Sequence, residues 1–171
     1  MTGSKAESAV EWLASVAPDP GACRREWESD PRAVALLPAG LRWDVLILPG
    51  QLGWPTFDIL TRLVDRPGPV LADFGDSRTG FFVPPGTVAG WLGTGVRGAG
   101  LGTWIVVPYP GRAHGGMRWL VPPDGSGTLN DPSRLELAMH EAAAGMATTE
   151  GGADPADPGG TDRESGEDGG T

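Results

Sequence analysis

The side chains in this sequence that could do chemistry are scattered acids, two histidines and a group of arginines. Asp44 opens one apolar run, "WDVLILPG", and Asp73 ends another, "GPVLAD". Two-metal catalysis needs several carboxylates that converge on ions about 4 Å apart. Asp44 and Asp73 are therefore candidate catalytic residues only if their strands bring them together. Mg²⁺ or Mn²⁺ is expected as a cofactor only in that case, and no metal site is predicted otherwise.

Basic and aromatic residues are concentrated between Arg78 and Trp119. Arginine binds phosphates through charged hydrogen bonds, and aromatic rings stack on nucleic-acid bases. The alternative interpretation is that the tryptophans belong to the core and that the arginines are solvated residues at the edges of a sheet. The candidate contacts for a nucleotide or a single-stranded nucleic acid are Arg78, Arg97, Arg112, His114, Arg118, Trp104 and Trp119.

Other common catalytic motifs do not occur in the sequence. No G-x-S-x-G elbow is present to display a nucleophilic serine. The stretch "GVRGAGLG" lacks the Gly-Lys-Ser/Thr ending of a phosphate-binding loop and leads into a predicted strand instead of a helix. One cysteine, Cys23, cannot form an internal disulfide or a cysteine metal site.

The net charge of −9 is distributed unevenly over the 171 residues. Residues 147–171 hold seven acids and one arginine, which leaves −3 for residues 1–146. We expect 1–146 to form one folded domain and 147–171 to be an acidic disordered tail, because the tail has almost no large apolar residues. A near-neutral body argues against a broad basic face for duplex binding. No signal peptide and no apolar run of about 18 residues is present, so we expect a cytoplasmic protein that does not enter a membrane.

The periodicity and the turn residues predict the order of elements along the chain. This order predicts an α+β domain, in which helices pack against a mixed or antiparallel sheet that contains two β-hairpins. The predicted elements are a helix over 5–17, a short helix before Pro31, a brief buried strand in "AVALLPAG", a strand over 43–48, a helix that starts at Pro55, a hairpin over 69–83, a short helix after Thr87, a second hairpin between "GTWIVVPYP" and "GMRWLVPP", and a last helix after Asp131.

This order of segments resembles the N-terminal domain of bifunctional DNA primase/polymerases of the archaeo-eukaryotic type. "AVEWLASVA" is similar to the opening helix of that family, and "WDVLILPGQLGWPTFDIL" to the strand and helix of its first catalytic motif. "GPVLADFGDSRTGFFVPPG" is similar to the hairpin of its second motif, and "GVRGAGLGTWIVVPYPGRAHGGMRW" to its glycine-rich strand pair. The likeness covers roughly residues 8 to 123.

The sequence departs from the family where the chemistry is expected. The family's Asp-x-Asp or Asp-x-Glu pair would fall within Leu46 to Pro49, where no carboxylate occurs. Its second motif has a histidine on the hairpin, where this chain reads "SRTGFF". Arg97, His114 and Arg118 stand where its later basic residues would. The resemblance implies a nucleotidyltransferase of DNA replication, whereas the missing acids argue against catalysis.

Three hypotheses follow from these residues. The first is a non-catalytic primase/polymerase-like domain that binds a nucleotide or a single-stranded nucleic acid through the basic and aromatic residues. The second is a scaffold that binds another protein, because the acidic tail would compete with nucleic acid for a basic groove. The third is an active primase-polymerase in which Asp44 and Asp73 replace the missing pair.

Overall fold

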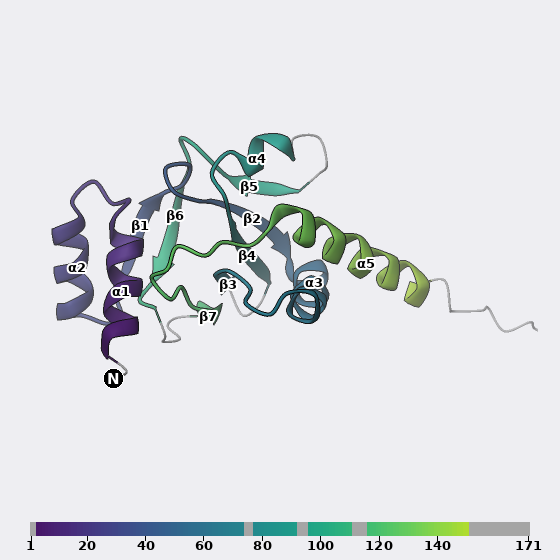
Figure 1. The fold of residues 1–171 in the computed structure, drawn as a ribbon, viewed down its shortest axis with the longest axis horizontal. Coiled ribbons are helices and arrows are strands. Elements are labelled where there is room, and N and C mark those ends of the chain that lie inside the picture. Colours follow the sequence, from purple (N-terminus) through teal and green to yellow (C-terminus); the bar gives the residue numbers. More distant parts are fainter. Residues whose placement is uncertain (1–2, 74–76, 92–95, 111–115, 151–171) are drawn as a thin grey trace, which may run out of the picture.

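The computed structural model describes residues 3–73, 77–91, 96–110 and 116–150 (Figure 1). Together the helices and strands in these ranges form the α+β domain that the sequence predicts. The helices are α1 (Gly3–Ala14), α2 (Pro20–Ser29), α3 (Gly50–Leu63), α4 (Thr87–Gly90) and α5 (Pro132–Glu150). The strands are β1 (Val34–Pro38), β2 (Asp44–Pro49), β3 (Val70–Asp73), β4 (Arg78–Val83), β5 (Arg97–Ala99), β6 (Trp104–Pro108) and β7 (Arg118–Val121).

The strands form two antiparallel sheets. The larger sheet has the order β5-β2-β4-β3-β7, and β1 pairs with β6 in a separate two-stranded sheet that we call the ribbon. The predicted hairpin over residues 69–83 is confirmed, because β3 and β4 pair in antiparallel register.

The second predicted hairpin is wrong. β6 pairs with β1 and β7 pairs with β3, so the two strands belong to different sheets. Each of them pairs with a strand that is distant in the sequence. If β6 and β7 paired with each other, β1 would lose the hydrogen bonds that it makes to β6, and β3 would lose those that it makes to β7.

The larger sheet has a hydrophobic cluster on each face. Phe81 and Phe82 are adjacent on β4 and therefore point to opposite faces. Phe82 packs with Trp27 and Trp43 in the cluster that α1, α2 and the ribbon cover. Phe81 packs with Leu135 and its neighbours in the cluster beneath α3 and α5. Figure 1 shows α1 and α2 beside the ribbon at one end and α3 with α5 at the other.

Three helix boundaries differ from the prediction. Helix α1 runs over Gly3–Ala14 instead of 5–17. Helix α3 begins at Gly50, directly after β2, and contains Pro55 instead of starting there. The proline removes one hydrogen bond to the carbonyl of Gln51, which is exposed and can be hydrated. Helix α5 continues to Glu150, past the predicted domain limit at residue 146. The remainder of the predicted tail, 151–171, lies outside the described residues.

The predicted burial of the strand in "AVALLPAG" is correct for one face only. Leu37 is buried, whereas Val34 and Leu36 are 45% and 59% exposed. None of the helices in the described part of the chain is long and apolar enough to cross a membrane.

Candidate functional site

An apolar groove of about 820 Å³ lies between the larger sheet and the ribbon. Val45, Ile47, Leu71 and Gly80 form its floor, on three neighbouring strands of the sheet. Ile47 lies at the centre of this floor, because it pairs with Gly80 on one side and with Arg97 on the other. The carboxyl end of β2 therefore presents an aliphatic side chain to the groove.

The ribbon supplies the opposite wall of the groove. Val34, Trp104 and Val106 line this wall, and Trp104 is 47% exposed. A half-exposed indole at the edge of an apolar groove has a free surface on which a planar ring can stack. Of the two tryptophans predicted to stack, Trp104 is therefore placed to do so.

Trp119 has a different environment. Its ring lies 5.5 Å from that of Phe82 between centroids, and its Nε1–H donates to the Pro108 carbonyl oxygen at 3.3 Å. Trp119 is half-buried and packs against the cluster under the ribbon. This position matches the alternative interpretation of the tryptophans, in which the ring belongs to the core.

Three arginines surround the groove. Arg78 and Arg32 line it directly, and both are exposed. Arg97 pairs with Ile47, so its exposed side chain projects from the same face of the sheet. The prediction included Arg78 and Arg97 but missed Arg32. The alternation Arg32, Val34, Leu36 marks the exposed face of β1, but the intervening residues are also apolar, which hides this alternation in the sequence.

Arg118 lies on the other face of the sheet. It pairs with Ala72, whose side chain faces α3 and α5. Its guanidinium carbon lies 5.3 Å above the centroid of the Trp54 ring on α3, within the range of a cation–π contact. The structure therefore separates Arg118 from Arg78 and Arg97, although the sequence had grouped them. Arg112 and His114 lie outside the described residues.

The two candidate catalytic acids do not meet. Asp44 pairs with Val83 at one end of β4, whereas Asp73 pairs with Arg78 at the other end. Their side chains also project from opposite faces of the sheet, because Val83 and Arg78 are five residues apart on one strand. The possibility that Asp44 and Asp73 replace the missing metal-binding pair is therefore wrong.

Each acid has a local structural partner. Asp44 is 1% exposed, and its Oδ2 accepts hydrogen bonds from the Gly86 and Val88 amides at 2.9 and 3.0 Å. It holds the turn between β4 and α4. At the rim of the groove, Asp73 Oδ2 lies 3.2 Å from Arg78 Nη2. These residues do not fit the two-metal centre that the family resemblance implies, because Asp73 is the only carboxylate among the described residues that line the groove.

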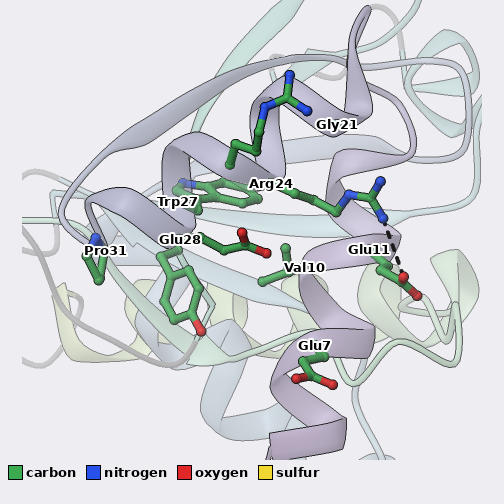
Figure 2. Close-up of a pocket in the computed structure, with 10 residues that line it drawn as sticks. Glu7, Val10, Glu11, Gly21, Arg24, Trp27, Glu28 and Pro31 are labelled. Carbon is green, nitrogen blue, oxygen red and sulfur yellow. Dashed lines mark hydrogen bonds and ion pairs between the residues drawn. The ribbon is translucent and has the colours of Figure 1, made fainter.

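Figure 2 shows a second hollow, of about 550 Å³, between α1 and α2. Glu7, Glu11 and Glu28 line it together with Arg24, whose Nη1 lies 3.4 Å from Glu11 Oε1. The Trp27 ring at its base is a core residue and donates its Nε1–H to the Ala33 carbonyl oxygen. Exposed charges of both signs line this hollow, and the described residues give it no preference for one class of ligand.

Comparison with known proteins found no matching family model, no matching curated protein and no matching solved structure. The resemblance to the primase/polymerase domain therefore stays a prediction. The groove between the sheet and the ribbon is the candidate site, because a tryptophan and three arginines surround its apolar floor.

Proposed function

We propose that this chain binds a nucleotide or a short single-stranded nucleic acid in the groove and does not catalyse a reaction on it. The observation that carries this proposal is the position of Trp104 and Arg78 on the same groove, over the apolar floor around Ile47. A volume of about 820 Å³ lies within the range of roughly 300–1,000 Å³ that is usual for small-molecule sites.

The groove offers a base and a phosphate separate places to bind. Trp104 would stack on the base, and Val106 and Ile47 would contact its apolar edges. Arg97 and Arg78 stand two strands apart, and Arg78 lies two residues before Gly80, which is level with Arg97 across β2. Strand geometry puts their Cα atoms roughly 12 Å apart. A ligand that carries more than one phosphate, or two nucleotides of a strand, can reach both guanidinium groups.

The absence of catalysis in this proposal follows from the side chains at the groove. Phosphoryl transfer by two metal ions needs carboxylates to hold the ions. The described part of the groove has Asp73 as its one carboxylate, and that carboxylate is paired with Arg78. Ile47 occupies the stretch in which the resembling family has its acids. We expect the domain to act in the cytoplasm, bound to its ligand without a divalent ion.

A protein-interaction domain is the second candidate function. Leu36 and Leu101 are 59% and 82% exposed and neither lines the groove. Exposed leucines outside the groove favour contact with a protein more than with a nucleotide.

The test is a fluorescence titration of the full chain with a deoxynucleoside triphosphate and with oligothymidine, each with and without Mn²⁺. We expect saturable quenching that does not need Mn²⁺ and that is lost in Trp104→Ala. Arg97→Ala should weaken binding about tenfold, because a charged phosphate contact is worth about 1.5 kcal/mol.

Arg118→Ala is the matched control, since it removes an exposed arginine from the opposite face of the sheet. It should leave the affinity unchanged. The proposal is wrong if no saturable signal occurs up to millimolar ligand, or if Arg97→Ala and Arg118→Ala have equal effects. Binding that requires Mn²⁺ would contradict its non-catalytic part.

A further inference from the structure

Gly80 is an accessible glycine in the middle of the larger sheet. It lies on β4, the central strand of the five, and it is half-buried, whereas its neighbours Val45 and Leu71 on the groove floor are buried. Ile47, its partner on β2, is the other half-buried residue of the floor. The groove therefore reaches down to the backbone of the sheet at Gly80.

Backbone conformation does not explain a glycine at this position. Gly80 lies in a regular strand and is not one of the glycines with a positive φ. A glycine inside a strand is unfavourable, because it has no side chain to pack and loses more conformational entropy on folding. Apart from residues 79 and 81, a Cβ at Gly80 would meet only Val45 Cγ1 at 3.0 Å and Leu71 O at 3.9 Å within 4 Å. The missing side chain therefore leaves space on the groove side of the sheet, as is usual where a ligand approaches the backbone.

The groove-facing positions of β4 differ in character from one end of the strand to the other. Arg78, Gly80 and Phe82 occupy successive positions on this face. Phe82 is fully buried, with its ring centroid 4.7 Å from that of Trp43 and 5.5 Å from that of Trp119, and it does not line the groove. Arg78 is exposed and stands two residues, or about 7 Å, from Gly80. The open position on this strand therefore lies between a closed aromatic end and a cation.

The groove around Gly80 offers few groups that could read the edge of a base. Strand β4 pairs with β2 on one side and with β3 on the other, so the backbone groups around Gly80 are used in the sheet. The Thr79 hydroxyl points toward α3, since a methyl group on Gly53 would overlap it. The other polar side chains of the described lining are all charged: Arg32, Asp73 and Arg78. The bottom of the groove therefore consists of aliphatic side chains and backbone.

We propose that Gly80 is the seat of the base and that the groove accepts any of the four bases. The ring would lie between the Gly80 backbone and the Trp104 indole, with Ile47 at its edge and its first phosphate toward Arg78. Stacking tolerates any base because every base has a π face, whereas discrimination requires hydrogen bonds to the base edge. This inference rests on the proposed function, to which it adds the ligand class and the residue that makes room for the base.

The first experiment compares dATP, dGTP, dCTP and dTTP by isothermal titration calorimetry with the full chain. We expect the dissociation constants of the two purine nucleotides to agree within about fivefold, and those of the two pyrimidine nucleotides likewise, because the stacking surfaces are similar within each class. Hydrogen bonds to a base edge would separate the members of a pair by more than about fivefold, and such a difference overturns the proposal.

The second experiment fills the proposed seat in two steps. Gly80→Leu should weaken dATP binding by at least about tenfold, because the base loses its stacking contact, and Gly80→Ala should weaken it by about threefold. Inorganic tripolyphosphate carries the phosphates without a base, so Gly80→Leu should bind it within about twofold of the parent. Gly90→Leu is the matched control, since Gly90 on α4 lies outside the groove and a Cβ there would meet no described atom within 4 Å. It should leave both affinities unchanged.

The possible outcomes separate this inference from the proposed function. Circular dichroism shows whether each variant is folded, and Gly80→Ala decides the question if the leucine variant does not fold. Folded Gly80 variants that bind dATP like the parent overturn this inference alone, because Trp104→Ala still tests the proposed function. Equal losses for dATP and tripolyphosphate also overturn it, since the substitution would then act on the arginines and not on the base. A parent chain that binds no nucleotide overturns the proposed function, and this inference with it.

Discussion

Replacing Asn130 with alanine should destabilise the whole domain, although Asn130 does not line the groove. The side chain is 2% exposed and stands just before α5. Its Oδ1 accepts from the Gly68 amide at 2.9 Å, and its Nδ2 donates to the carbonyl oxygens of Pro69 and Phe82 at 3.0 and 2.9 Å. One amide therefore joins the start of α5 to the segment before β3 and to β4.

The loss of stability differs between the three hydrogen-bond partners of the Asn130 side chain. Pro69 O also accepts from Phe82 N–H, and Phe82 O also accepts from Asn130 N–H, so both carbonyls keep a partner. The Gly68 amide has no second partner among the described residues and would be left buried without one, at a cost of about 1–3 kcal/mol. Two further hydrogen bonds of about 0.5–1.5 kcal/mol each are lost. We expect the free energy of unfolding to fall by about 3–4 kcal/mol.

Urea unfolding followed by tryptophan fluorescence measures this loss. Thr128→Ala, at an exposed position in the same loop, is the matched control and should change the unfolding free energy by less than about 0.5 kcal/mol. An Asn130→Ala variant within about 1 kcal/mol of the parent would refute the reasoning, because the buried amide could then be lost without a penalty.

The Asn130→Asp variant tests the same buried site through the pH dependence of its stability. The new carboxylate would face two carbonyl oxygens in a buried site, which should raise its pKa above that of an unfolded aspartate. Its protonated form would then be the stable one in the fold. The variant should therefore be most stable below the unfolded pKa of about 3.9 and should lose that stability as the pH rises through the raised folded value.

Three other buried positions have measurable outcomes. A methyl group on Gly53 would overlap the Thr79 side chain between α3 and β4, so Gly53→Ala should lower the unfolding free energy by about 2 kcal/mol. Thr79→Val should leave it unchanged or raise it, because the Thr79 hydroxyl is buried with no hydrogen-bond partner in the described structure; a clear loss in urea unfolding would contradict this. Burial, and then the charge of Glu26, raises the pKa of the Cys23 thiol. At pH 8 we expect Ellman's reagent to label Cys23 at least about tenfold more slowly than in the urea-unfolded chain, and equal rates would contradict the burial.

Local patterns predicted the elements well, and non-local pairing limited the prediction of the sheets. Only four residues separate β3 from β4 in the sequence, so the stretch between Pro69 and Val83 contains the information needed to pair them. Strands β6 and β7 show the same strand-turn-strand pattern, yet each pairs with a strand elsewhere in the chain. The stability of those pairings depends on which edges the other strands leave open, and no local pattern reports that.

The candidate site was harder to predict because a side chain's direction depends on register. Arg78 and Arg118 both begin a strand and look equivalent in the sequence. Arg78 pairs with Asp73 and faces the groove, whereas Arg118 pairs with Ala72 and faces α3. A shift of one residue in either strand would move the arginine of that strand to the other face. The same dependence separates exposed Trp104 from half-buried Trp119, so residue type was predictable and orientation was not.

The end of β2 shows why one substitution would not create a metal site in this groove. An aspartate at position 47 would lie between Gly80 and Arg97, because these residues pair with Ile47 on either side. Its nearest charged neighbour across the strands would be a guanidinium group, and Asp73 is already paired with Arg78. The new carboxylate would therefore form an ion pair more readily than it would bind a divalent cation. Around Ile47, the described side chains favour an anion over a cation, which supports the proposal that phosphates bind in the groove without a metal ion.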